Sequence, residues 1–331
     1  MNKLKVGIIA EAIIILVLLA LMIKIFYNPF NPDNNYCEKN YDNANKCLLS
    51  PRVYTNIILP KSYLIFNLGP LKKEIEDYLN ESNLNVSVYM ANLRDGASFE
   101  IQSNKAYPAA SLNKLPLAIL ILRKVESSNL SLNTNLSILD EDRDMSSGSL
   151  YFKDISQLSV KELLYYMLSE SDNTATNVLG RQATKEELTK LSDYIDFYSN
   201  DIRKEEQPLK TTEITTKKVS NIFSSLYLST VLEPKDSELI LSYLKNTSFD
   251  IKKYANLPDE VAVVQKEGFH YLDDGSFFHS CGIIYVKDSR FSFCIMTEGI
   301  DRNKAPFVIG EIVNKTYNFI VKGRNMTKSG I

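Results

Sequence analysis

Three short segments constrain this chain more than any other feature of its sequence. They are, in order, Ser111-Leu112-Asn113-Lys114, Ser171-Asp172-Asn173 and Lys266-Glu267-Gly268. The first stands before the run Leu115 to Leu122, which is apolar on all sides of a helix and therefore indicates a helix buried in the core. The second follows the helical pattern of residues 163–168, and the third ends the strand-like run of residues 261–265.

The residue types of the first segment suit nucleophilic catalysis. A serine hydroxyl attacks a carbonyl carbon only when a base removes its proton. Ser111 and Lys114 are three residues apart at the start of a helix, so their side chains share one face. A lysine becomes a base when burial or a neighbouring cation lowers its pKa. The start of the helix also offers the N–H of Ser111 to a developing oxyanion.

Each segment has a plainer interpretation when it is taken alone. The first also describes an ordinary buried helix with a serine near its N-terminus. Ser and Asn commonly cap helices, which accounts for the second. The third is equally a charged, glycine-terminated end of a strand. The order of the three segments and the elements that carry them favour a common catalytic site.

In this order the segments resemble the S-x-x-K, S-D-N and K-T-G motifs of class A β-lactamases and the related penicillin-binding serine hydrolases. The separation of Ser111 from Ser171 is also similar to that in class A enzymes. The resemblance covers about residues 70 to 322. It implies an α+β fold in which both ends of the domain build an antiparallel sheet and a helical block is inserted between them.

The resemblance also implies a role for each polar residue of the first two segments. Ser111 would carry the acyl group, and Lys114 would be the base. Ser171 would relay a proton to the leaving group. Asp172 would hold the loop, while Asn173 would bond a substrate amide and Lys114.

The third segment matches the family only in part. Lys266 would supply positive potential to a substrate carboxylate, and Gly268 would allow close backbone approach. The N–H of Phe269 would join that of Ser111 as the second oxyanion donor. Glu267, however, stands where the family has Thr or Ser. An ionised Glu267 would repel a substrate carboxylate or pair with Lys266, so we expect poor β-lactam hydrolysis.

A second departure concerns deacylation. Class A β-lactamases carry a glutamate in an E-x-x-L-N loop, and this glutamate activates the water that hydrolyses the acyl-enzyme. Here Glu206-x-x-Leu209 keeps part of that spacing, but Lys210 replaces the Asn and the loop is short. Glu205 and Glu206 are the candidates for a deacylation base, and a pair of exposed loop glutamates is the other interpretation. Without such a base, acylated Ser111 would turn over slowly.

The remaining pattern predicts β elements near both ends of the domain and helices between them. The N-terminal elements are a helix at Leu71 to Asn80 and strands at residues 85–91 and 97–101 around the turn Asp95-Gly96. A hairpin of residues 280–286 and 291–296 and a helix at about 304–321 follow near the C-terminus. Capping boxes at Ser159/Glu162 and Thr184/Glu187 indicate helix starts, and two further helices begin near Thr215 and Pro234.

The N-terminus predicts a membrane anchor. Residues 6–27 are almost entirely apolar, interrupted by Glu11 and Lys24, and are long enough to span a bilayer as a helix. Lys3 and Lys5 precede the run, which puts the N-terminus in the cytoplasm and the domain outside. A cleaved signal peptide is the alternative, but no small-x-small cleavage site follows the run.

The sequence thus predicts four consecutive parts of the chain. They are a cytoplasmic tail (1–5), a transmembrane anchor (6–27), an extracytoplasmic linker and N-terminal extension (28–70) and a β-lactamase-like domain (71–323). The formal net charge is −2, with acids and bases interspersed, so nucleic-acid binding has no support.

The cysteines and histidines lack metal-ligand spacing, so no metal site is predicted, and the proposed chemistry needs no cofactor. Outside the membrane, Cys37 and Cys47 are able to close a small disulfide loop. Cys281 and Cys294 lie on the two arms of the predicted hairpin. They are either cross-strand neighbours or two buried free thiols.

The sequence thus predicts a membrane-anchored, extracytoplasmic serine hydrolase of the cell envelope that acts on a small acyl substrate, either a β-lactam or a peptidoglycan-like peptide. A penicillin-binding D,D-peptidase and a non-catalytic cell-envelope binding protein that retains the fold are the alternatives.

Overall fold

The computed structural model describes residue 48 and residues 67–204, 212–272, 275–286 and 289–328. The expected anchor at 6–27, Cys37 and Cys47, and the candidate bases Glu205 and Glu206 lie outside these residues. Within the described ranges, we find no helix that combines the length and apolar character needed to cross a bilayer.

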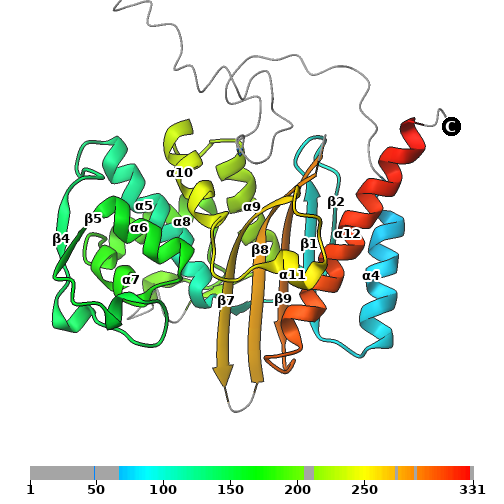
Figure 1. The fold of residues 1–331 in the computed structure, drawn as a ribbon, viewed down its shortest axis with the longest axis horizontal. Coiled ribbons are helices and arrows are strands. Elements are labelled where there is room, and N and C mark those ends of the chain that lie inside the picture. Colours follow the sequence, from blue (N-terminus) through cyan, green and yellow to red (C-terminus); the bar gives the residue numbers. More distant parts are fainter. Residues whose placement is uncertain (1–47, 49–66, 205–211, 273–274, 287–288, 329–331) are drawn as a thin grey trace, which may run out of the picture.

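A five-stranded antiparallel sheet joins the two ends of the domain, which confirms the predicted α+β class (Figure 1). Its strand order is β2-β1-β9-β8-β7. The strands are β1 (Val86–Asn92), β2 (Ser98–Ile101), β7 (Ala262–Leu272), β8 (Gly275–Val286) and β9 (Ser289–Glu298). The N-terminal β1 pairs with the C-terminal β9 along its whole length, so the sheet forms only when both ends of the domain meet.

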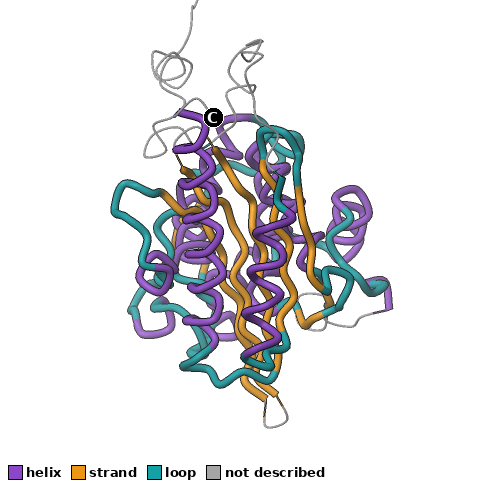
Figure 2. The backbone as a smooth tube through the Cα atoms, turned by 90° about the vertical axis from the view of Figure 1, so that its right-hand side faces the viewer, coloured by secondary structure: helices purple, strands orange, loops and turns teal. Residues whose placement is uncertain are grey.

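Helices cover both faces of this sheet. On one face lie α4 (Gly69–Glu81), α11 (Ile251–Ala255) and α12 (Ala305–Lys328), and Figure 2 shows long helices in front of the sheet, running roughly along the strands. On the other face, α9 (Thr216–Tyr227) packs against β1, β8 and β9 and connects the sheet to the helical block. Apolar side chains fill the space on each side, and the sheet separates the two clusters.

The inserted block consists of helices with short connecting elements. The helices are α5 (Lys114–Glu126), α6 (Val160–Ser169), α7 (Asn173–Gly180), α8 (Lys185–Ile195) and α10 (Pro234–Leu244). The 3-10 turns are η1 (Ala110–Asn113), η2 (Asp140–Asp142), η3 (Leu150–Phe152) and η4 (Ile202–Lys204). Two small ribbons pair β3 (Tyr107–Pro108) with β6 (Glu213–Ile214) and β4 (Asn135–Ser137) with β5 (Gln157–Ser159).

The central helix of the block is α5, and its burial follows directly from its composition. Every residue from Lys114 to Leu122 is buried, as the apolar run predicts. Fully burying each Leu or Ile contributes about 1.5–3 kcal/mol relative to exposure, so this helix organises the core around it. The capping boxes at Ser159/Glu162 and Thr184/Glu187 begin α6 and α8 as predicted.

Cys281 and Cys294 form a disulfide between β8 and β9. The two residues are direct partners in the antiparallel register, and their side chains lie on the face that carries the helical block. The structure therefore selects the cross-strand interpretation of these cysteines over two free thiols.

The prediction that Lys266-Glu267-Gly268 ends a strand is wrong. β7 continues to Leu272, and residues 268–272 pair with residues 275–279 of β8. Gly268 fits within the strand because it lies where another backbone segment approaches, which is a common setting for a glycine inside a strand. The third segment therefore lies in the middle of an edge strand.

Gly310 allows close contact between α12 and α11. A Cβ atom at this position would lie 2.4 Å from the carbonyl oxygen of Tyr254. We expect Gly310→Ala to destabilise the domain by about 1–3 kcal/mol, because overpacking outweighs the better helix propensity of alanine. Urea unfolding measures this change. Asn318→Ala, at an exposed position of the same helix, is the control and should stay within about 0.5 kcal/mol of wild type. Equal stability of Gly310→Ala and wild type would show that the helices are farther apart.

Candidate active site

Ser111 and Lys114 meet at the junction of η1 with α5. Ser111 lies in the 3-10 turn and is half-buried, while Lys114 is the first residue of α5 and is 3% exposed. Lys114 Nζ is 3.1 Å from Ser111 Oγ. Ala110, directly before the serine, has a φ of +47°, an uncommon conformation for a residue with a Cβ. This turn exposes Ser111 beside the buried amine.

The second segment contacts the same amine. Lys114 Nζ donates to the backbone oxygen of Ser171 at 2.6 Å and to Asn173 Oδ1 at 2.8 Å. It is also 3.1 Å from Ser171 Oγ. Ser171 adopts a φ of +55°, which turns the chain between α6 and α7. The structure thus brings together four predicted residues that are up to 62 positions apart, counted from Ser111 to Asn173 (173 − 111).

These contacts are compatible with a neutral lysine that acts as a base. A neutral amine has two N–H donors and one lone pair, whereas an ammonium has three donors and no lone pair. Ser171 O and Asn173 Oδ1 accept only, so they take two N–H groups. In the neutral form the lone pair is then left for a hydroxyl proton, and Ser111 Oγ is within reach.

The surroundings of Lys114 weaken its hold on a proton. Burial holds the pKa of Lys114 well below the ordinary lysine value, and the positive charge of Lys266 lowers it further. The carboxylates of Glu267, Asp172 and Asp144 oppose this shift but do not outweigh it. A lysine in this setting loses its proton far more readily than one in water.

Asp172 positions the second segment from within the core. Its side chain is fully buried, and Oδ1 accepts from the N–H of Ala175 at 2.8 Å, which caps α7. Oδ2 accepts from the N–H of Leu150, also at 2.8 Å. The segment does cap a helix, but through Asp172 and not through the Ser or Asn that the capping interpretation named. The same cap holds Ser171 and Asn173 against Lys114.

A further loop supports the site, and the sequence motifs did not indicate it. Asn173 Nδ2 donates to Ser146 Oγ at 2.8 Å, and the N–H of Ser146 donates to Asp144 Oδ1 at 2.8 Å. These bonds orient the Asn173 amide so that its oxygen faces Lys114. The stretch Ser146-Ser147-Gly148-Ser149 reads as a turn, and nothing in its spacing connects it with Asn173.

The third segment forms a buried ion pair. Lys266 is fully buried, and its Nζ is 3.0 Å from Glu267 Oε1 and 3.2 Å from the Glu267 backbone oxygen. Glu267 is 4% exposed, and its Oε2 has no hydrogen-bond partner in the described part of the chain. Of the two outcomes expected for this glutamate, pairing with Lys266 is the one observed.

Gly268 brings β7 against the turn that carries Ser111. A Cβ atom at Gly268 would lie 3.4 Å from the Ala109 backbone oxygen and 3.4 Å from Leu112 Cγ. Phe269 follows along the strand, and its side chain is partly exposed. The edge strand and η1 are therefore neighbours, and the three sequence segments converge on one region.

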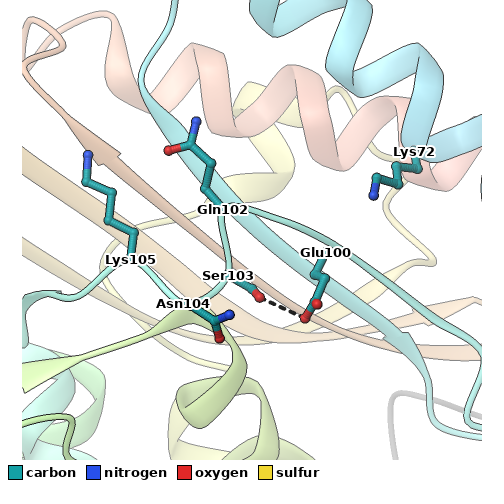
Figure 3. Close-up of a pocket in the computed structure, with 6 residues that line it drawn as sticks. All are labelled: Lys72, Glu100, Gln102, Ser103, Asn104 and Lys105. Atoms are coloured by element: carbon teal, nitrogen blue, oxygen red, sulfur yellow. Dashed lines mark hydrogen bonds between the residues drawn. The ribbon is translucent and has the colours of Figure 1, made fainter.

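A separate polar hollow of about 370 Å³ lies beside α4 and β2 (Figure 3). It is lined by Lys72, Glu100, Gln102, Ser103, Asn104 and Lys105. Ser103 Oγ donates to Glu100 Oε2 at 2.7 Å within it. None of the predicted site residues lines this hollow, so it is distinct from the Ser111 region.

Residues 70–320 match the model of the β-lactamase enzyme family, and the chain therefore belongs to that family. It is a serine hydrolase of the β-lactamase-like group. Among curated relatives, it is 20% identical to β-lactamase VEB-1 of Pseudomonas aeruginosa over 75% of this chain and 90% of the relative. It is 25% identical to β-lactamase SME-1 of Serratia marcescens over 59% and 70% of the two chains.

Solved structures show the same fold. The extended-spectrum β-lactamase TLA-1 superposes with a TM-score of 0.68 at 20% identity, over 77% of this chain and all of the other. PBP-A superposes with a TM-score of 0.67 at 19% identity, over 77% of this chain and 97% of the other. The L158E mutant of PBP-A, solved as an acyl-enzyme complex with penicillin G, matches with a TM-score of 0.66 at 20% identity, over 76% of this chain and 97% of the other.

Gly148 tests whether the supporting loop positions the site. Its φ is +91°, and a Cβ atom there would lie 2.1 Å from Asp172 Oδ2 and 2.4 Å from Asp172 Cα. We expect Gly148→Ala to displace residues 171–173 and to slow Ser111 acylation by about tenfold or more, since small misplacements in a catalytic site are costly. Acylation rates with a serine-reactive acyl probe, measured on folded protein, give this effect.

Gly96→Ala is the matched control for this variant. Gly96 also has a positive φ, +81°, but among the described residues, apart from its chain neighbours, no atom lies within 4 Å of the position of an added Cβ. It should lose about 1 kcal/mol of stability and keep the wild-type acylation rate. An unchanged rate in Gly148→Ala would contradict the positioning role of this loop.

Proposed function

We propose that this protein is a membrane-anchored, extracytoplasmic serine hydrolase that forms an acyl-enzyme on Ser111. The observation that carries the proposal is the placement of Lys114 Nζ, 3.1 Å from Ser111 Oγ and hydrogen-bonded to Ser171 O and Asn173 Oδ1. This arrangement supplies a nucleophile next to a buried base whose own donors are already engaged.

In the proposed acylation, Ser111 Oγ bonds to the acyl carbon of the substrate while its proton passes to the neutral amine of Lys114. The bond from the acyl carbon to the leaving group then breaks. The leaving atom takes a proton that Lys114 returns through the Ser171 hydroxyl, whose oxygen is 3.1 Å from Nζ. Water subsequently hydrolyses the Ser111 ester, releasing an acid and restoring the hydroxyl.

We assign the oxyanion hole to the N–H groups of Ser111 and Phe269. Contact between Gly268 and the η1 turn supports this assignment, because it keeps β7 beside the nucleophile. Two backbone donors aimed at the developing charge supply a large part of acyl-transfer catalysis. Asn173, Lys266, Glu267 and Gly268 are assigned to substrate binding.

We further propose that β-lactam turnover is poor and that the acyl substrate is an envelope amide or ester. The Lys266–Glu267 pair supports this, because the lysine charge is already compensated. A deacylation base at Glu205 or Glu206 remains part of the proposal. A D,D-peptidase-like reaction uses the same acylation step and differs in its acyl acceptor.

The proposed attachment to the membrane rests on the sequence. Residues 6–27 would cross the bilayer with residues 1–5 in the cytoplasm, and 28–70 would connect the anchor to the catalytic domain at 71–323. The domain would then meet its substrates on the outer side of the membrane.

Covalent labelling tests the proposed nucleophile. We expect a fluorescent penicillin, or a simple acyl thioester where the penicillin reacts slowly, to add its acyl mass to wild-type protein and not to Ser111→Ala. Intact-mass spectrometry followed by peptide mapping locates the adduct. If a panel of β-lactams, esters and thioesters leaves Ser111 unmodified, the chain is a non-catalytic binding protein.

The pH dependence of acylation tests the proposed base. Below its lowered pKa, Lys114 becomes an ammonium and cannot accept the Ser111 proton, so the rate should rise with pH. The rate should level off well below about pH 10.4, the ordinary lysine value, because the pKa of Lys114 is lowered mainly by burial. Lys114→Ala should lose about 10²–10⁴-fold in rate. A profile that rises only in the ordinary lysine range would refute a neutral Lys114.

The same lowered pKa makes a stability prediction. The pKa of Lys114 is lower in the folded protein than in the unfolded chain. At a pH between these two values the unfolded chain binds more protons than the folded protein. The contribution of Lys114 to the free energy of unfolding therefore increases as pH rises through this range. Urea unfolding across pH should show this slope in wild type, and the slope should be smaller in Lys114→Ala. Identical slopes would contradict a lowered pKa.

A further inference from the structure

His279 is a buried ionisable residue that the proposed acylation does not use. It lies on β8, is 0% exposed, and its Nε2 is 3.1 Å from the backbone oxygen of Pro108. Burial lowers the pKa of His279 to about 4, so the ring is neutral near neutral pH. A carbonyl oxygen only accepts, so Nε2 carries the ring proton and Nδ1 is a bare acceptor. Nδ1 has no partner among the described residues, and because an unsatisfied buried acceptor costs free energy, packing alone does not explain a histidine here.

The His279 side chain lies on the face of the sheet that carries the helical block and the η1 turn. His279 is the direct register partner of Gly268 on β7, and opposed residues project to one face. A Cβ atom at Gly268 would lie 3.4 Å from both the Ala109 backbone oxygen and Ala110 Cβ. Phe277, two residues before His279 on the same strand, packs against the core of the helical block. The imidazole therefore points toward the segment that leads into the nucleophile turn.

That segment is β3, and side chains of the sheet contact both of its residues. The Tyr107 hydroxyl is 2.8 Å from Ser87 Oγ on β1, and the Tyr107 ring meets the His279 ring edge-on with centroids 5.4 Å apart. Pro108 has no N–H, so its carbonyl oxygen is its only backbone hydrogen-bonding group, and this oxygen accepts from His279. Because β1 and β8 are not neighbours in the sheet, β3 is attached to two separate strands.

The turn that follows β3 needs support because its backbone is unfavourable. Ala110, directly before Ser111, has a φ of +47°. On one side, the backbone oxygen of Thr212 accepts from the N–H of Ala109 at 2.9 Å. Thr212 Oγ1 also donates to Asn113 Oδ1 at 2.9 Å. These bonds hold the turn from one side, and the imidazole on β8 holds the chain before the turn from the other.

We propose that His279 is a positioning residue for the nucleophile. Its Nε2–H bond to the Pro108 oxygen fixes the chain that enters η1, and this keeps the hydroxyl and N–H of Ser111 in place beside Lys114. His279 acts through β3 and does not itself touch the substrate. The inference rests on the proposed acylation of Ser111 and adds a residue that lies outside the three sequence segments.

Three variants separate the hydrogen bond from the packing of the ring. His279→Leu removes the donor, and His279→Gln keeps an N–H at a similar distance from the backbone. Asn314→Leu is the matched control, because Asn314 Nδ2 donates to the backbone oxygen of Ala255 at 2.7 Å on the opposite face of the sheet. Release of thiophenol from the S-phenyl thioester of N-acetylglycine, followed on folded protein over a range of concentrations, gives the acylation rate constant and the dissociation constant separately.

His279→Leu should slow acylation about tenfold or more at saturating thioester and keep the dissociation constant within about twofold, since a misplaced nucleophile affects the chemical step. His279→Gln should recover most of that loss. Asn314→Leu should keep the wild-type rate, although it also loses a bond from a side chain to a backbone oxygen. An unchanged rate in His279→Leu, or equal losses in His279→Leu and His279→Gln, would overturn the inference while the acyl-enzyme proposal stands.

Proton–nitrogen NMR of the histidine rings tests the hydrogen bond without a change at His279. The chain has two histidines, and His270→Gln assigns their signals. Near neutral pH, His279 should carry its proton on Nε2, protected from exchange with water, and have a bare Nδ1. A proton on Nδ1 instead would overturn the inference, even if His279→Leu does not fold. If neither this thioester nor other esters acylate Ser111 of wild type, the proposed function fails, and the positioning role fails with it.

Discussion

The buried amine of Lys114 is the interaction on which the rest of the site depends. It links the η1–α5 junction to the segment between α6 and α7 through Ser171 O and Asn173 Oδ1. Burying a lysine is unfavourable unless its donors are satisfied or its charge is lost. Here two carbonyl oxygens accept hydrogen bonds from Nζ, and burial together with the Lys266 charge holds the pKa of Lys114 well below the ordinary lysine value. In the neutral form of the amine, the same contacts leave its lone pair for Ser111.

The surrounding structure holds unfavourable local conformations in place. Ala110 and Ser171 both have positive φ angles, which cost a residue with a Cβ about 1–3 kcal/mol when the backbone is strained. Packing of α5 in the core and the Asp172 cap of α7 compensate for them. The Lys266–Glu267 pair is a further concentration of polarity in the interior. A buried pair of this kind adds little net stability compared with well-packed apolar side chains.

Much of the fold was predictable because its signals are local. The apolar run from Leu115 to Leu122 predicted a buried helix. The capping boxes at Ser159 and Thr184 predicted the starts of α6 and α8. The hairpins at the two ends of the domain were also predictable from alternation and turn residues. The continuation of β7 past Gly268 was missed, since a glycine after two charged residues looks like a strand end unless the pairing with β8 is known.

Local chemistry in the chain was enough to predict the family, the helices and strands, and the residue types that suit acyl transfer. Only the tertiary structure shows that the three sequence segments meet. Ser111, Ser171 and Lys266 belong to separate elements, and tertiary packing brings these elements together. The Asn173–Ser146–Asp144 bonds and the close approach of Gly148 to Asp172 left no mark in sequence spacing. Glu267 stands between these cases. Its identity signals a departure from the family, but only the tertiary structure shows that its side chain is buried and paired with Lys266.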